Sequence, residues 1–197
     1  FTKFNQNLLG DEGELYLEIQ NVQDLEGLPK SLVDAAKASA VARNKPGSWV
    51  IDNTRSSIDP FLTYSNNRSL REKAWRMFIN RGDNGDARDN NAIITPILQL
   101  RAERAKLLGY PTHAHWRLAN TMAKTPEKAM ELMESVWTPA VQLVKTEVAD
   151  MQDIANKENA GIKIEAWDYR YYAEKVRKAK YDLDQNEVKQ YLQMEKL

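Results

Sequence analysis

Residues 167–172 place a tryptophan, an aspartate, an arginine and three tyrosines together at the start of an expected helix. Tyrosines at the wall of a cleft present flat rings and hydroxyls that can donate to a peptide carbonyl. The same side chains can form a buried aromatic anchor whose hydroxyls find partners within the chain. From the residues alone both interpretations stay open.

Metal chemistry has little support in the sequence. The chain has no cysteine and two histidines, His113 and His115. A catalytic zinc needs convergent ligands, and residues two apart on a helix point in nearly opposite directions. There is no His-Glu-x-x-His motif and no Gly-rich phosphate loop. From the residues alone we therefore expect neither histidine to bind a metal ion.

Two clusters of charged residues could bind ligands. The first is a run of acids along one expected helix, and the second is a group of basic residues with an excess of three positive charges. Paired carboxylates can bind a divalent ion, and arginines can bind a carboxylate or phosphate. Solvated helix faces explain the acids better and the basic residues equally well. The clusters comprise Glu127, Glu131, Glu134, Glu147, Asp150 and Asp153, and Arg68, Arg71, Lys73, Arg76, Arg81 and Arg88.

The composition excludes several classes of protein. Twenty-eight basic residues balance twenty-eight acidic ones in 197 residues, so the formal net charge is zero. Nucleic-acid binders and proteins of anionic membranes need a positive field, and we expect neither partner. No apolar run approaches the ~20 residues of a transmembrane helix. The sequence is silent on localisation.

The pattern of apolar residues predicts a mainly α fold. Residues 1–66 read as a mixed segment with short helices and one or two short strands, the candidates being Leu15–Ile19 and 49–51. Residues 67–197 read as a helical region. We expect one compact piece. Gly10 is expected to end a first helix, and Pro60 to open a short one. The later helices are expected at 67–82, 93–107, 112–122, 125–160, 167–181 and 184–197.

Two prolines complicate the helical region. Pro96 either follows an N-cap at Thr95 or lies inside a helix that starts earlier, and Pro139 predicts a kink in the longest helix. That helix carries apolar residues three or four positions apart from Met130 to Met151. A stripe so broad is typical of a face buried against other helices.

The ordered motifs of the chain resemble the thimet-oligopeptidase-like zinc metallopeptidases (M3). The segments that carry the resemblance are 67–73, 81–82, 89–90, 98–103, 107–110, 122–127 and 167–175. Upstream, the segments 27–29, 49–51 and 60–64 fit the peptidyl-dipeptidase branch of that family. The chain starts at Phe1 and stops at Leu197 within a helical pattern, so we read it as an internal fragment of such an enzyme.

The resemblance implies a specific role. Members of the family have two mainly helical lobes around a narrow channel that admits short peptides, with zinc held by a His-Glu-x-x-His helix expected beyond Leu197. The parent would then bind zinc and remove C-terminal dipeptides, while this chain supplies scaffold and channel wall and is inactive alone. Tyr171 and Tyr172 are the expected wall residues that bind substrate. None of the family's metal ligands or catalytic residues has a counterpart in this sequence, so the resemblance implies no metal and no catalytic residue here. Neither His113 nor His115 matches the family's metal motif.

Two alternatives remain open. The first is an endo-acting oligopeptidase of the same family, because specificity depends on parts outside this sequence. The second is an all-helical interaction module without catalysis, which the broad apolar stripes and zero net charge also suit. Because the chain is read as a fragment of a larger fold, it is expected to expose apolar surface and to associate with itself.

Overall fold

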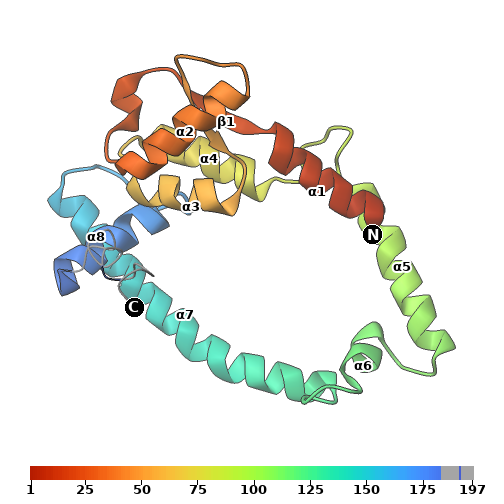
Figure 1. Cartoon of the computed structure of the whole chain (residues 1–197). Coiled ribbons are helices and arrows are strands. Elements are labelled where there is room, and N and C mark those ends of the chain that lie inside the picture. Colours follow the sequence, from red (N-terminus) through yellow and green to blue (C-terminus); the bar gives the residue numbers. More distant parts are fainter. Residues whose placement is uncertain (183–190, 192–197) are drawn as a thin grey trace. The chain divides into compact units, whose positions relative to one another are not determined.

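The computed structural model describes residues 1–182 and Tyr191, and within them the chain is mainly α-helical (Figure 1). The chain divides into two compact units: Phe1–Tyr16 with Arg76–Lys145, and Leu17–Trp75 with Thr146–Leu197. Both described strands lie within residues 1–66, as expected. The division at residue 66 and the single compact piece stay predictions. None of the helices described is long and apolar enough to cross a bilayer.

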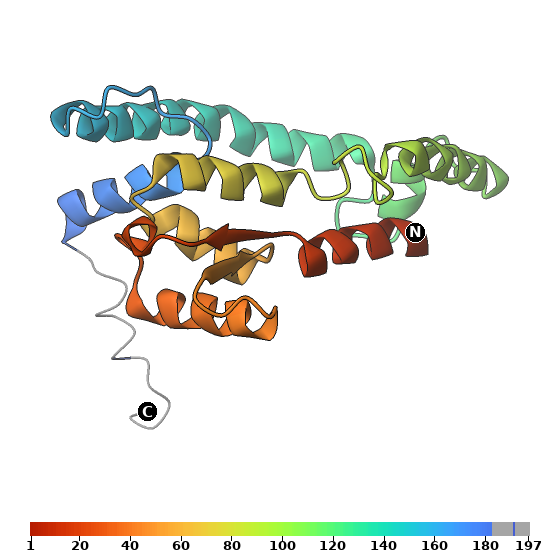
Figure 2. The ribbon, with the colours of Figure 1, turned by 90° about the horizontal axis from the view of Figure 1, so that it is seen from above.

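The core of the second unit forms around two short strands, β1 (Tyr16–Ile19) and β2 (Trp49–Asp52), which hydrogen-bond to each other. A 3-10 turn (Val22–Leu25) and α2 (Lys30–Ala42) connect them, and Figure 2 shows α2 beside this small sheet. Val50 and Ile51 are fully buried, which explains why the apolar run at 49–51 predicted a strand correctly.

The helix expected at Pro60 begins earlier than predicted. The helix α3 spans Arg55–Tyr64 with Pro60 in its interior. Ile58, Phe61 and Leu62 are all buried, and their spacing of three and four residues forms one helical face. Burying Ile58 requires the helix to start before it, and this outweighs the single hydrogen bond that Pro60 cannot donate.

The prediction that Gly10 ends the first helix is wrong. In the first unit, α1 runs from Thr2 to Glu14. A Cβ on Gly10 would lie 2.8 Å from Cδ of Arg88, so the glycine allows a close approach rather than a helix end. The next residue, Asp11, is fully buried and accepts hydrogen bonds from the backbone N–H of Gly82 at 2.8 Å and from Asn84 at 2.9 Å.

The middle helices follow the sequence closely, except that the helix expected at 112–122 ends at Leu118. The helix α4 spans Arg68–Ile79, α5 spans Asn91–Leu107 and α6 spans His113–Leu118. Because α5 begins at Asn91, Pro96 lies inside it, which settles the alternative that the sequence left open. Thr112 caps α6, accepting a hydrogen bond from the backbone N–H of His115 at 3.3 Å.

The longest helix, α7, spans Pro126–Lys157, and α8 spans Tyr169–Tyr181. Contrary to the prediction of burial, the apolar stripe over the first two thirds of α7 is exposed, with Trp137 at 70% and Leu132 at 68%. Only Met151 and Ala155 of this helix are buried. The breadth of the stripe indicates a face suited to burial, but it does not show which residues would cover it. The described residues do not cover it. The kink at Pro139 stays a prediction, and the helix expected at 184–197 lies outside the described residues.

Candidate functional site

The aromatic start of α8 is held against the end of α7 by a short linking segment. After Gly161, whose φ is +63°, the chain runs extended past Gln152, whose amide donates to the Ile162 carbonyl at 2.8 Å. Its carbonyl oxygen accepts from the backbone N–H of Ile164 at 3.0 Å. These two bonds fix the link, and with it the position from which α8 begins.

A buried carboxylate connects the start of α8 to α4. Asp168 is fully buried and accepts hydrogen bonds from Nη2 of Arg68 at 2.8 Å, Nη2 of Arg71 at 2.8 Å and the backbone N–H of Glu165 at 3.2 Å. Arg71 is itself 2% exposed, and its Nη1 donates to the carbonyl of Ser65 at 2.8 Å. We call Arg68, Arg71 and Asp168 the Asp168 clamp.

Electrostatics keep this clamp charged. Burial alone would raise the pKa of Asp168, but the hydrogen bonds from Arg68 and Arg71 oppose it, and the pKa lies below its usual value. The carboxylate in turn raises the pKa of Arg68. The clamp is therefore a charge-assisted bond network between two helices that are about 100 residues apart in sequence.

Tyr171 packs against two cations, and its hydroxyl forms a hydrogen bond within the chain. The guanidinium carbon of Arg71 lies 4.1 Å from the ring centroid, and Nζ of Lys175 lies 4.5 Å from it. The hydroxyl donates to Oδ1 of Asn66 at 3.0 Å. Cations above aromatic faces are favourable, so the ring adds a second link from α8 to Arg71.

Tyr172 lies in the core of this unit. It is 3% exposed and packs with Met151 and Ala155 of α7, and burial raises the pKa of its hydroxyl. Its ring meets that of Tyr171 edge to face with 5.2 Å between centroids. The two candidate residues thus lie side by side on α8, with Tyr171 against Arg71 of α4 and Tyr172 against α7. Whether they serve a substrate channel stays a prediction.

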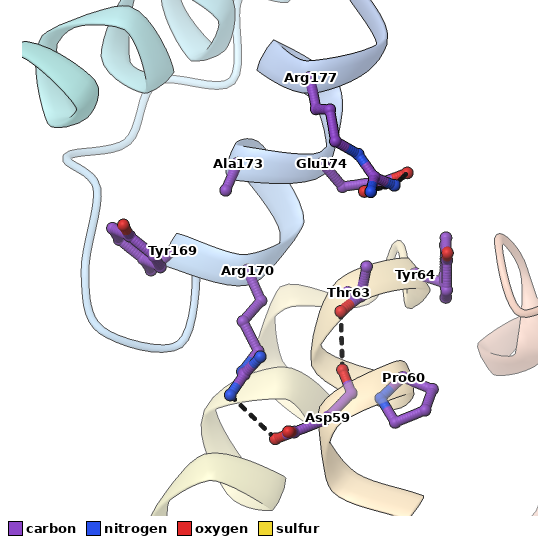
Figure 3. A pocket seen from close by; sticks show the side chains of 9 residues that line it. All are labelled: Asp59, Pro60, Thr63, Tyr64, Tyr169, Arg170, Ala173, Glu174 and Arg177. Carbon is purple, nitrogen blue, oxygen red and sulfur yellow. Dashed lines mark hydrogen bonds and ion pairs between the residues drawn. The ribbon is translucent and has the colours of Figure 1, made fainter. Parts of the chain in front are cut away.

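A groove runs between α3 and α8, with a volume of about 410 Å³ (Figure 3). Its lining comprises Asp59, Pro60, Thr63, Tyr64, Tyr169, Arg170, Ala173, Glu174 and Arg177. Arg170 pairs with Asp59 at 3.1 Å, and Arg177 donates to Glu174 at 2.6 Å. Charges of both signs alternate along it, so the groove offers donors and acceptors but no net field. No pattern in the sequence indicated it, because α3 and α8 are far apart in the chain.

Tyr169 borders this groove at the end nearest α7. Its hydroxyl donates to Oε2 of Glu147 at 3.2 Å. Burial and the nearby Glu147 carboxylate raise its pKa, so the phenol stays protonated and acts as a donor. The three neighbouring tyrosines therefore differ in role: Tyr169 faces the groove, Tyr171 stacks on cations and Tyr172 fills the core.

The basic cluster singled out in the sequence is divided by the fold. Arg68 and Arg71 belong to the Asp168 clamp. In the other unit, Arg81 pairs with Glu12, and Arg88 pairs with Glu14. These arginines are occupied by acids of the same chain, and the pattern does not form one anion site. Of the acidic run, Glu131 and Glu134 are exposed on α7, as expected.

The described residues do not fit a zinc site. No group of three or more His, Asp or Glu side chains among them could hold a metal ion. His115 contacts the hydroxyl of Thr112 through Nδ1 at 2.8 Å and lies 3.6 Å from Glu127 through Nε2. Nδ1 of His113 lies 3.5 Å from Nη2 of Arg104. The two histidines thus have separate partners and do not converge.

The helical scaffold that carries the clamp and the groove matches a known family of enzymes. The family model for peptidase family M3 matches residues 61–197. This chain belongs to peptidase family M3. The match includes the last turn of α3 and all of α4 and α8, the helices that build the clamp and the groove.

Similar proteins cover almost the whole chain. Dipeptidyl carboxypeptidase of Escherichia coli is 33% identical over 193 residues, which are 98% of this chain and 28% of that protein. The probable cytosolic oligopeptidase A of Arabidopsis thaliana is 34% identical over 207 residues, covering 99% of this chain and 29% of that protein. Oligopeptidase A of Salmonella typhimurium is 31% identical over 177 residues, 88% of this chain and 26% of its own length. The chain thus spans less than a third of the length of these relatives.

Proposed function

We propose that this chain is part of a zinc metallopeptidase that removes dipeptides from the C-termini of short peptides. Membership of family M3 supports the class of enzyme, and the relatives named dipeptidyl carboxypeptidase support the exo-acting mode. In this proposal the zinc is bound by the whole enzyme, of which this chain is one part. The described residues do not provide its ligands, so the chain alone is expected to be inactive.

The contribution of this chain is mechanical. A channel that admits short peptides and excludes folded proteins needs rigid walls. The Asp168 clamp carries this proposal, because it fixes the start of α8 to α4 through two buried groups. Tyr171 then supports the wall by packing α8 against Arg71 of α4, and Tyr172 does so by packing α8 against α7. Tyr169 and Arg170 face the groove.

An endo-acting oligopeptidase is the alternative within the family, favoured by the relatives named oligopeptidase A. The two modes differ in their products. An enzyme that reads the C-terminus releases dipeptides from a free terminus and spares the same peptide when its terminus is amidated. An endo-acting enzyme cleaves both forms internally.

A chimera tests the proposal. The matching segment of Escherichia coli dipeptidyl carboxypeptidase is replaced by this chain, and the purified, zinc-loaded protein is incubated with a short peptide in free and amidated forms. We expect dipeptide release from the free form only, measured by mass spectrometry. A folded, zinc-loaded chimera that cleaves neither peptide contradicts the proposal, and internal cleavage of both forms assigns the endo-acting alternative.

The exposed stripe of α7 favours a second property, self-association of the isolated chain. Trp137, Val136 and Leu143 are each at least 60% exposed on one helix. Patches of this kind associate in water because burial removes apolar surface from solvent. We propose that the 197-residue chain forms oligomers through this face, as expected for a fragment that leaves apolar surface exposed.

A further inference from the structure

Two arginines of the first unit lie over the ring of one tryptophan, and a third precedes one of them by about one helical turn. Arg104 of α5 and Arg117 of α6 both lie over the ring of Trp116, with their guanidinium carbons 4.2 Å and 5.5 Å from its centroid. His113 stacks beside the same ring at 5.5 Å and lies 3.5 Å from Arg104. Arg101 lies one turn before Arg104 on α5. We call Arg101, Arg104 and Arg117 the arginine cluster.

The cluster differs from the other arginines of its unit. Arg81 and Arg88 each pair with an acid of α1, whereas none of the three cluster arginines forms an ion pair with an acid in the described part of the chain. Arg101 instead lies 5.1 Å from the ring of Phe1, and its buried Nε has no hydrogen-bond partner there. Guanidinium groups form their strongest bonds with oxyanions, and residues 1–182 supply none to these groups.

The positive charge of the arginine cluster is not offset by an ion pair with a described acid, and two of its guanidinium groups are open to solvent. Burial lowers the pKa of His113, and the three guanidinium groups lower it further, so this imidazole is neutral at pH 7. The acid at Glu127 faces His115 rather than the cluster. Arg104 and Arg117 are exposed, which leaves their donors open to a ligand from solvent.

We propose that the arginine cluster is a binding site for the carboxylate side chains of an acidic peptide. Arg101 and Arg104 are spaced by about 4.5 Å along α5, and Arg117 approaches from α6. Donors spread over this distance engage more than one carboxylate, which an acidic segment supplies and a single C-terminal carboxylate does not. Trp116 offers an apolar surface beside them for the peptide's carbon chains.

Nucleic acid fits the cluster less well. Its binding depends on many phosphate contacts along an extended basic surface. This chain has no net charge. Two of the three arginines lie one turn apart on α5, and the third lies on the six-residue helix α6. A compact cationic cluster next to an indole suits a short peptide better.

Calorimetric titration tests the proposal with three peptides of equal length. The first is rich in Glu and has both termini blocked, the second is its Gln counterpart with blocked termini, and the third is the Gln counterpart with a free C-terminus. We expect saturable binding of the Glu peptide, weakened by salt, and about tenfold weaker or no binding of the other two.

The variants locate the site. The double substitution Arg104→Gln and Arg117→Gln is expected to weaken binding of the Glu peptide by about tenfold or more. Arg55→Gln, which removes an exposed arginine of the other unit, is expected to leave it unchanged. Circular dichroism checks that each variant is folded, and the single variants replace the double one if it is not. Equal binding by the double variant, equal binding of the third peptide, or tighter binding of inorganic phosphate than of the Glu peptide would each overturn the proposal.

Discussion

Oδ1 of Asp168 lies 2.8 Å from Nη2 of Arg71, although the two residues are 97 positions apart and both are buried. Arg68 binds the same carboxylate from the exposed side. A buried ion pair is a weak source of net stability, but the removal of one partner leaves an uncompensated charge. This relationship therefore makes the attachment of α8 to α4 sensitive to a single substitution.

The first prediction concerns that substitution. Asp168→Asn keeps the shape of the side chain and removes its charge, so Arg71 stays buried without a counter-ion. We expect the free energy of unfolding to fall by about 3–5 kcal/mol. Denaturant titration followed by circular dichroism measures it. Asp34→Asn breaks an exposed pair with Lys30 and should cost no more than about 0.5 kcal/mol. Equal losses in both variants would contradict the clamp.

The second prediction concerns the pH dependence of stability. The pKa of Asp168 is lower in the folded chain than its ordinary value. A carboxyl of this kind contributes stability above its unfolded pKa of about 3.9, and the contribution is lost as the pH falls through the folded value. The stability difference between the native chain and Asp168→Asn should therefore be constant from pH 7 to about pH 5 and shrink below about pH 4. Unfolding curves across this range measure it. A difference that shrinks between pH 7 and pH 5 would mean that the pKa is raised.

The third prediction separates the two candidate tyrosines. Tyr172→Ala removes a ring from the core and should cost about 3–5 kcal/mol, whereas Tyr171→Phe removes one hydrogen bond to Asn66 and should cost about 1 kcal/mol. In the chimera, the paired change of Tyr171 and Tyr172 to Phe should lower kcat/KM if these side chains support the channel wall. Unchanged kinetics in a folded chimera would count against that role.

The sequence predicted local structure well because local rules decide it. The strand at 49–51, the cap at Thr112 and the helix at 167–181 follow from apolar period and capping chemistry, and the structure has each of them, with α8 beginning at Tyr169. Contacts between distant segments carry no such signature. The pairing of Asp168 with Arg71 and the groove between α3 and α8 depend on how helices meet, which no spacing along the chain encodes. For the same reason the stripe of α7 could be recognised but its exposure could not.

The fourth prediction tests a backbone position near the clamp. Gly27 has a φ of +86°, and a Cβ there would lie 2.2 Å from the carbonyl oxygen of Tyr64. Gly27→Ala should therefore lower the free energy of unfolding by about 2 kcal/mol or more. Gly13→Ala is the matched control, because Gly13 lies in α1 and a Cβ there would meet no atom within 4 Å. Alanine at this position should stabilise the helix by about 0.5–1 kcal/mol. A stabilised Gly27→Ala variant would show that the loop can move away from Tyr64.

The fifth prediction concerns the exposed stripe of α7. If this face drives self-association, sedimentation velocity should show the chain shifting to larger species as its concentration rises. Trp137→Glu places a charge in the centre of the stripe and should abolish that shift, while the loss of folding stability stays small because Trp137 is 70% exposed. Gln142→Glu adds the same charge at another exposed position of α7 and should leave the shift intact. A chain that stays monomeric at every concentration, or a Trp137→Glu variant that associates as the native chain does, would remove this face as the site of association.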